Sequence, residues 1–534
     1  MNLGNRHSQH SFSKVPEVNQ ARSVFDRSFA TKDTFDFDYL NPVFVEEILP
    51  GDTINLSVKS FIRLATQVVP LMDNMYLDYF FFFVPNRLVW NNWEKFNGAQ
   101  DDPGDSTDFL VPNLDDNGVG GFDVGTIFDH FGLPTGVRFQ TPVINSLPFR
   151  AYNLIWNEWF RDQNLQDRVT VLKTDGPDPI ANYNLLKRAK KHDYFTSALP
   201  WPQKSAQPVS LPLGTLAPVV GFGKLNKNWG GSNSVYETDN PVPVTYTNSS
   251  VFGDSSGANE LWYAKRGANG EPAIYADLSD ATAATINQFR VAMMTQSLLE
   301  LDARGGTRYI EIIQAHWGVT NPDFRLQRPE FLSGGTSYIS QHVVSQTSES
   351  GTTPQANLAA FSTASETGGK IGFTKSFTEH GFVIGLVQAR ADVTYQQGLN
   401  KMWTRSTRYE YFWPKLQELG EQAVLNREIY AQGNSSDDDV FGYQERYAEY
   451  RYRPSEIKGQ FRSTFAETLD VWHLAEEFGS LPSLNNTFIQ SSTPIARSLV
   501  VTDGYPALLG DFFFQMKHVR QIMTYGVPAT LGRF

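Results

Sequence analysis

Hydrophobic and polar residues alternate along TINLSVKSFIRL, residues 53–64. Ile54, Leu56 and Val58 fall on one face of an extended chain, and polar residues lie between them, which is the pattern of a half-buried strand. The preceding PGD at 50–52 predicts the turn that leads into this strand. The segment therefore predicts a strand with one face toward a core.

Four further segments also have strand patterns. MYLDYFFFFVP (75–85) contains a run of four phenylalanines before its final proline, which predicts a strand buried on both faces. FVIGLVQARADVTY (382–395) begins as a buried run and ends in alternation, and LDVWHL (469–474) and DFFFQMKHV (511–519) also predict strands. Because these segments are far apart in the chain, we expect a mainly β protein: one β-sandwich with long insertions between its strands.

Two segments predict helices. The apolar positions of 152–160 recur at helical spacing, and this stripe is expected to pack into the core. A second, long helix is expected after Asp280, a residue type that caps helix N-termini. Its apolar positions include Ile286, Phe289 and Met293, and its length predicts a structural strut.

The chain is expected to divide into five parts. These are an N-terminal arm (1–40), first strands with a helix and insertions (41–202), a large insertion (203–280), a helical and loop insertion (281–380), and the remaining strands with a basic tail (381–534). Pro, Gly, Ser and Asn dominate the large insertion. Loops of such length are either functional or disordered.

The composition is that of a globular chain, because 40% of the 534 residues are hydrophobic and 19% are charged. The absence of cysteine excludes disulfides, thiolate metal sites and a cysteine nucleophile. No apolar run approaches the roughly 18 residues of a membrane span. The polar N-terminus lacks the apolar segment of a signal peptide. We therefore expect neither a membrane span nor a signal peptide.

The net charge of −12 is unevenly distributed. Residues 1–32 and 515–534 each carry a net charge of +3, so the body between them is strongly acidic. Basic ends on an acidic body predict an anionic partner that meets the ends. The alternative is that the ends are simply solvated.

Motifs for catalysis and metal binding are weak. GDSSG (253–257) matches a nucleophile pattern, but it lies in a polar loop without the strand and helix that the pattern requires. The acidic segments 437–439 and 114–118 lack the ligand spacing of a calcium loop. No histidine pair has metal-protease spacing, and no carboxylate pair of a glycosidase can be named. We predict no catalytic residue, metal or cofactor, and therefore no enzyme.

One basic run is conspicuous in this acidic chain. KRAKKHDYFTSALPWPQK (187–204) begins with Lys187, Arg188, Lys190 and Lys191 and continues with aromatic residues. If the run were helical, Lys187 and Lys191 would share one face. Such cations engage phosphates whatever the sequence, and neighbouring rings stack on the bases of a single strand. The alternative is a solvated helix face.

Longer strings resemble the major capsid protein of the Microviridae, in particular the gokushovirus branch. They cover most of the chain, with weak regions near 205–280 and 340–370. The strings are VFDRSFATKDTFDFDYLNPVFVEEILPGDT (24–53), DNMYLDYFFFFVPNRLVWNNWEKFNG (73–98), HDYFTSALPWPQK (192–204), WPKLQELGEQAVLNREIYAQG (413–433), DDDVFGYQERYAEYRYRPSEIKGQFRS (437–463) and LDVWHLAEEFGSLPSLNNTFI (469–489).

This resemblance implies an eight-stranded antiparallel jelly roll in a T=1 icosahedral shell around a circular single-stranded DNA genome. It implies a bacteriophage virion that assembles from many copies in the host cytoplasm, which suits a chain without cysteine. The implied partners are an internal scaffolding protein, a small basic DNA-packaging protein, a pilot or minor spike protein and a host receptor. Residues 203–280 are the positional candidate for a surface protrusion at the three-fold axes that meets the host.

In such a shell, basic side chains are candidates for an inner surface that faces DNA or the packaging protein. The candidates are Lys187, Arg188, Lys190, Lys191, Lys401, Arg405, Arg408, Lys517 and Arg520. Ion pairs with the acidic body of neighbouring subunits are the alternative role for these residues. Two other classes of protein stay open on the residues alone: a receptor-binding fibre or attachment protein, and a carbohydrate-active β-sandwich protein.

Overall fold

A computed structural model describes most of the chain. The described residues are 21–115, 120–139, 144–204, 286–306, 309–318, 325–352, 355–502 and 504–525, with the backbone of four short strands between 219 and 276. The chain forms two compact units, which are described separately: residues 1–202 with 319–534, and residues 203–318.

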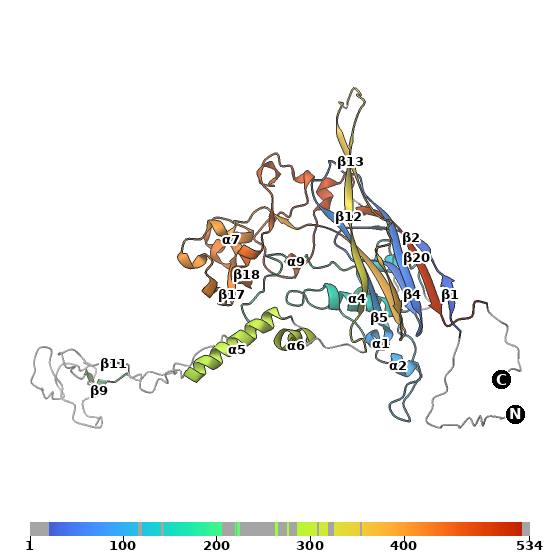
Figure 1. Cartoon of the computed structure of the whole chain (residues 1–534), viewed down its shortest axis with the longest axis horizontal. Coiled ribbons are helices and arrows are strands. Elements are labelled where there is room, and N and C mark those ends of the chain that lie inside the picture. The colour runs from blue at the N-terminus through green and yellow to red at the C-terminus, as the bar shows by residue number, and fades with distance from the viewer. Residues whose placement is uncertain are drawn as a thin grey trace, which may run out of the picture. The chain divides into compact units, whose positions relative to one another are not determined.

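The larger unit is built on a ten-stranded antiparallel sheet (Figure 1). Its main path runs in the order β1-β20-β4-β13-β12-β5-β15-β3, while β2 pairs with β20 and β14 with β4. The strands are β1 (Ser23–Asp26), β2 (Phe29–Phe35), β3 (Asn41–Ile48), β4 (Thr53–Leu64), β5 (Met75–Pro85), β12 (Glu330–Ser345), β13 (Leu358–Glu366), β14 (Gly372–Ser376), β15 (Gly381–Ala391) and β20 (Leu508–Arg520).

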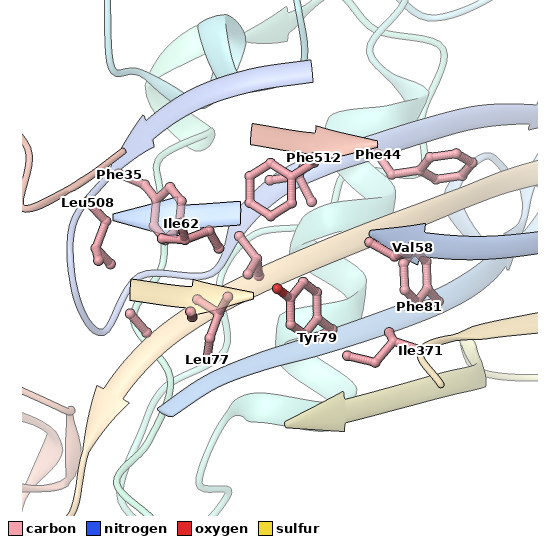
Figure 2. Packing of buried hydrophobic residues seen from close by; sticks show 14 of the residues in the cluster. Phe35, Phe44, Val58, Ile62, Leu77, Tyr79, Phe81, Ile371, Leu508 and Phe512 are labelled. Atoms are coloured by element: carbon pink, nitrogen blue, oxygen red, sulfur yellow. The ribbon is translucent and has the colours of Figure 1, made fainter. Parts of the chain in front are cut away.

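The sheet curls so that its two halves enclose a core. Strand β12 joins the halves, because its first residues pair with β5 and its last residues pair with β13. Tyr79 of β5 and Ser60 of β4 share a buried hydrogen bond of 2.6 Å, and the rings of Phe44 and Phe514 lie 5.1 Å apart. Figure 2 shows Tyr79 and Phe44 among the buried hydrophobic side chains of this core. The predicted fold class, a mainly β antiparallel sandwich, is confirmed.

Four of the five predicted strands are present. In β4 the alternation of buried and exposed residues follows the sequence pattern, and β20 alternates in the same way. Strands β5 and β15 are buried on both faces. The turn at 50–52 is present, and Gly51 adopts the left-handed conformation with φ of 87°.

The strand predicted at 469–474 is wrong. Residues Asp470–Trp472 form a short 3₁₀ helix, η8. Loop contacts satisfy the polar groups there: Ser463 donates to Asp470 at 2.8 Å, and the backbone of Leu474 donates to Asp73 at 2.9 Å. The other six strands of the sheet, β1, β2, β3, β12, β13 and β14, were not predicted. In β12 and β13, serine, threonine and glycine residues weaken the strand signal.

Helices cover the outer face of the β5/β15 half. The predicted helix is confirmed as α4 (Leu147–Ile155), which continues as the π-helical turn η1 (Trp156–Phe160). Together with α1 (Asn86–Val89) and α3 (Ile127–His130), it packs on Phe82 and Ile384 in a second hydrophobic cluster. The four-phenylalanine run therefore supplies both layers: Phe81 and Phe83 face the sandwich, and Phe82 faces the helices.

A third hydrophobic cluster, which includes Tyr194, Tyr395 and Phe441, joins the loops of the C-terminal half. The remaining elements of this unit are short: α2 (Trp93–Phe96), β6 (Leu114–Asp115), β7 (Asp178–Pro179), η2 (Ile180–Asn182), β16 (Thr394–Tyr395), η3 (Lys401–Trp403), η4 (Arg408–Glu410), η5 (Pro414–Leu416), β17 (Glu421–Leu425), α7 (Asn426–Ile429), η6 (Ser435–Asp438), β18 (Val440–Glu445), α8 (Ala448–Arg451), β19 (Ser455–Glu456), η7 (Gly459–Phe461), α9 (Asn486–Ile489) and η9 (Ile495–Ser498).

The smaller unit contains two short strand pairs and two helices. Strand β8 (Val219–Val220) pairs with β11 (Tyr275–Ala276), and β9 (Phe222–Lys224) pairs with β10 (Trp262–Ala264). The expected long helix is confirmed as α5 (Ile286–Arg304), and α6 (Tyr309–Trp317) follows it. Asp280 and the GDSSG motif lie outside the described residues. None of the helices in the described ranges is long and apolar enough to cross a membrane.

Candidate nucleic-acid interface

The basic run at 187–191 is extended, so the helical interpretation of it is wrong. Lys187 forms a β-bridge with Tyr39, and Ala189 forms one with Gln490. The backbone N–H of Lys190 donates to the carbonyl of Ile489 at 2.7 Å. Because successive side chains of an extended segment point to opposite sides, the four cations of the run lie in different environments.

Two of these cations are paired with carboxylates of the same subunit: Lys190 is buried, and Arg188 is 30% exposed. Lys190 is only 4% exposed, lies 2.7 Å from the carboxylate of Glu476 and sits over the ring of Phe488. Burial raises the pKa of Glu476, although the nearby ammonium group opposes this shift. Arg188 donates to Asp78 at 3.2 Å. Burial also lowers the pKa of the Arg188 guanidinium. Both side chains therefore contribute to packing and ion pairing within the subunit.

The other two cations of the run remain accessible. Lys191 is exposed, and Lys187 is partly exposed with its ammonium 5.0 Å from the ring centre of Tyr39. The structure thus divides the run into an inner pair, Arg188 and Lys190, and an outer pair, Lys187 and Lys191.

A pocket of about 280 Å³ lies beside this run. Lys191, Arg188 and Arg390 line it, and Asp78 is the one carboxylate among its lining residues. Asp78 accepts hydrogen bonds from Arg390 at 2.7 Å and from Arg188 at 3.2 Å. Because two guanidinium groups share that carboxylate and Lys191 adds a third cation, the lining is net positive.

The pocket also has an aromatic wall. Phe331 on β12 lines it and is 43% exposed. Cations beside an exposed ring are the groups that bind a phosphate and stack on a base of single-stranded nucleic acid. Sequence reasoning missed Arg390. The only signal was its place near the end of the strand that the pattern at 382–395 predicted.

The other predicted cations are also divided. Lys401, Arg405 and Arg520 are largely buried and pair with acidic residues of the same subunit. Their partners are Glu428 at 3.5 Å, Glu449 at 2.9 Å and Asp52 at 2.9 Å, respectively. Arg408 and Lys517 are exposed, and Arg408 lies 4.4 Å from the ring centre of Trp413. The accessible candidates are therefore Lys187, Lys191, Arg408 and Lys517.

The acidic side chains at 437 and 438 stabilise the loop that contains them. Asp437 accepts hydrogen bonds from the backbone of Gln432 and Gly433 at 2.9 and 2.7 Å, and Asp438 pairs with Arg427. Within the described ranges, no group of three or more histidine, aspartate or glutamate side chains is arranged to hold a metal ion.

Comparison with known proteins identifies the family to which the chain belongs. Residues 13–530 match the family Phage_F, described as "Capsid protein (F protein)". The chain belongs to this capsid family. Membership indicates a structural role, and a capsid role calls for assembly with further copies.

Relatives within the capsid family extend over nearly the whole chain. Capsid protein VP1 of Bdellovibrio phage phiMH2K is 62% identical, with 100% of both chains covered. Capsid protein VP1 of Chlamydia phage 1 is 42% identical and that of Spiroplasma virus 4 is 35% identical, with 97% of each chain covered in both cases. These three proteins come from gokushoviruses of the Microviridae, so the resemblance found in the sequence is confirmed.

Proposed function

We propose that the chain forms a T=1 icosahedral shell that encloses a circular single-stranded DNA genome of a small bacteriophage. The observation that carries this proposal is the match of 13–530 to the capsid family, together with full-length similarity to a phage VP1 protein. The curled sheet supports it, because it supplies a rigid body whose long insertions are available for contacts between subunits.

The accessible cations are proposed to face the genome or a small basic packaging protein. In the pocket, Lys191 binds a phosphate, and a base stacks on the ring of Phe331. Lys187, Arg408 and Lys517 add phosphate contacts elsewhere. A chain with a net charge of −12 cannot neutralise a genome alone, which supports a separate basic partner.

The remaining partners follow from the same proposal. The subunit assembles in the host cytoplasm with an internal scaffolding protein, and the virion also contains a pilot or minor spike protein. Residues 203–280 form the surface protrusion that contacts a receptor on the host cell. Their length and composition support this role, because a loop of this length is seldom a passive connector.

The decisive experiment is native mass measurement on particles from their source, combined with nuclease protection. Subunits of 60.1 kDa in a closed shell of about sixty copies give a mass of about 3.6 MDa before the genome is counted. Protected circular single-stranded DNA in particles of at least that mass is the expected result. Particles of another copy number, or particles that protect double-stranded DNA or RNA, would contradict the proposal.

A further inference from the structure

Strands β12 and β13 continue beyond the sheet as a two-stranded ribbon. Strand β12 pairs with β5 up to Ile339, and from Ser340 to Ser345 its pairing partner is β13. Strand β13 returns to the sheet at Thr363, where its pairing with β4 begins. Between these points, 342–361 contain the ribbon, of which the structure describes 342–352 and 355–361, and Figure 1 shows it reaching past the other strands of the sheet.

The base of the ribbon is firmly attached to the sandwich. Buried Gln67 donates to buried Ser362 at 2.9 Å and accepts from Gln341 at 3.4 Å. Just above, the rings of His342 and Phe361 stack at 4.9 Å across the strand pair. The ribbon therefore leaves the body in a defined direction.

Beyond its base, the ribbon exposes apolar side chains. Val343, Val344, Leu358 and Phe361 are 56%, 47%, 52% and 41% exposed. A hairpin of two strands is marginally stable in water and requires packing against something else. Its outer edges also present unpaired backbone groups, which are available to another chain. Among the described residues of one subunit, the ribbon thus lacks the cover that would stabilise it.

The charge of the ribbon identifies the kind of partner. Residues 342–361 contain one glutamate and no lysine or arginine. A ribbon without lysine or arginine has no such cation with which to bind the phosphates of nucleic acid. Apolar surface of this kind is instead covered by protein, and a capsid subunit meets many copies of itself.

We propose that the ribbon 342–361 is an assembly arm that packs its apolar side chains against a neighbouring copy of the chain. This inference rests on the proposed shell. It goes further in naming the segment that joins one subunit to the next. Particle formation is checked first by the mass measurement described above, so a failure of the shell proposal is recognised separately.

The first test uses the absence of cysteine in the chain. Ser345→Cys places a unique thiol on the ribbon, and its reaction with a maleimide is compared in free subunits and in particles. We expect labelling to be at least about tenfold slower in particles, because the core of an interface is packed like a protein interior. Equal rates in the two states would overturn the proposal.

A photo-cross-linker attached to the same thiol identifies the covering chain. A product with the mass of two subunits supports the assembly arm. Cross-linking only to another virion protein would overturn it, because the proposed partner is a second copy.

The second test changes the apolar surface itself. In Val343→Ser with Leu358→Ser we expect subunits that melt at the wild-type temperature but give at least about tenfold fewer particles. These two side chains are 56% and 52% exposed, and exposed side chains contribute little to subunit stability. Val343→Ile with Leu358→Met is the matched control: it keeps the apolar bulk and is expected to assemble like the wild type. Normal particle yield from the serine variant would contradict the arm.

Discussion

At the residue scale, an ion pair between Arg150 and Asp178 connects three segments of the larger unit. Both side chains are fully buried, and two parallel hydrogen bonds of 2.6 Å join them. Tyr183 donates a further hydrogen bond to Asp178 at 2.6 Å, and Arg150 donates to the carbonyl of Val89 at 3.0 Å. The pair thus ties α4 to α1 and to the segment at β7.

Removal of one partner leaves a buried charge without compensation. For Asp178→Asn we expect the free energy of unfolding of unassembled subunits to fall by about 3–5 kcal/mol, measured by denaturant titration. Lys32→Ala is the control. It removes an exposed pair with Asp511, with side chains 78% and 49% exposed, and is expected to change stability by about 0–1 kcal/mol. A smaller effect at Asp178 than at Lys32 would refute this account.

The same carboxylate makes stability depend on pH. Burial alone raises the pKa of Asp178, but hydrogen bonds from Arg150 and Tyr183 outweigh it and hold that pKa below its ordinary value. A lowered folded-state pKa stabilises the fold above the unfolded value of about 3.9, and this contribution disappears as pH falls through the folded value. The stability difference between wild type and Asp178→Asn should therefore shrink below about pH 4. A difference that stays constant down to about pH 2 would contradict this.

Neighbouring lysines of the basic run are expected to behave differently. Lys190→Ala leaves the buried carboxylate of Glu476 unpaired and should destabilise the subunit by several kcal/mol, about 3–5. Lys191→Ala should leave the melting temperature unchanged. It should lower the slope of log affinity for single-stranded DNA against log salt by about 0.7, the value for one lost phosphate contact. Lys32→Ala serves as the control for the stability measurement, because it removes only an exposed ion pair.

The opposite pattern, a stable Lys190 variant or an unchanged salt slope at Lys191, would contradict the division of the run. Replacement of all four cations together would confuse the two effects, because it would remove an internal ion pair along with surface charge.

At the element scale, β5 and β15 form the middle layer of the larger unit, since the sandwich core lies on one side and the helices on the other. Close packing at this pair of strands depends on a glycine. A β-carbon at Gly385 would lie 2.6 Å from the ring of Phe81 and 2.9 Å from the β-carbon of Phe44. The missing side chain allows three strands to approach closely.

For Gly385→Ala we expect a loss of about 1–3 kcal/mol, because an added methyl group in a packed core forces its neighbours to move. Thermal unfolding of free subunits measures the effect. Gly104→Ala is the matched control, since a β-carbon there meets no atom within 4 Å. If the two variants melt at the same temperature, the close approach at Gly385 is not essential.

At the scale of the whole molecule, the chain separates the sandwich from a second compact unit. The sandwich unit combines 1–202 with 319–534. Its sheet can therefore be completed only after residues 203–318 have been synthesised. The core of the sandwich draws on β4 and β5 from the first part and on β15 and β20 from the second. No residue of 203–318 appears in its three hydrophobic clusters among the described residues.

Replacement of 203–318 by a flexible Gly/Ser linker should therefore leave the sandwich folded. We expect the melting temperature of the subunit to change little and host adsorption of any particles to be lost. Melting is measured on subunits, and adsorption is measured against wild-type particles. An unfolded product would show that the two units depend on each other, and normal adsorption would remove the proposed host role of 203–280.

The sequence by itself determined the fold class, four strands, both helices and the capsid family. These features depend on local alternation, on helical spacing and on long strings of residues. For example, the sequence of 53–64 alone predicts which of its side chains are buried, because side chains alternate between the two faces of any extended strand. The strand predicted at 469–474 is absent, because a strand also needs a partner.

Only the tertiary structure decided which cations are accessible. Lys190 and Lys191 are adjacent and chemically identical, yet one is buried against Glu476 and the other is exposed. Their difference arises from a partner 286 residues away, which no local pattern contains. The ribbon of β12 and β13 was hidden for the same reason. Pairing between strands is a non-local interaction, and its polar sequence resembles a loop until the partner strand is in place.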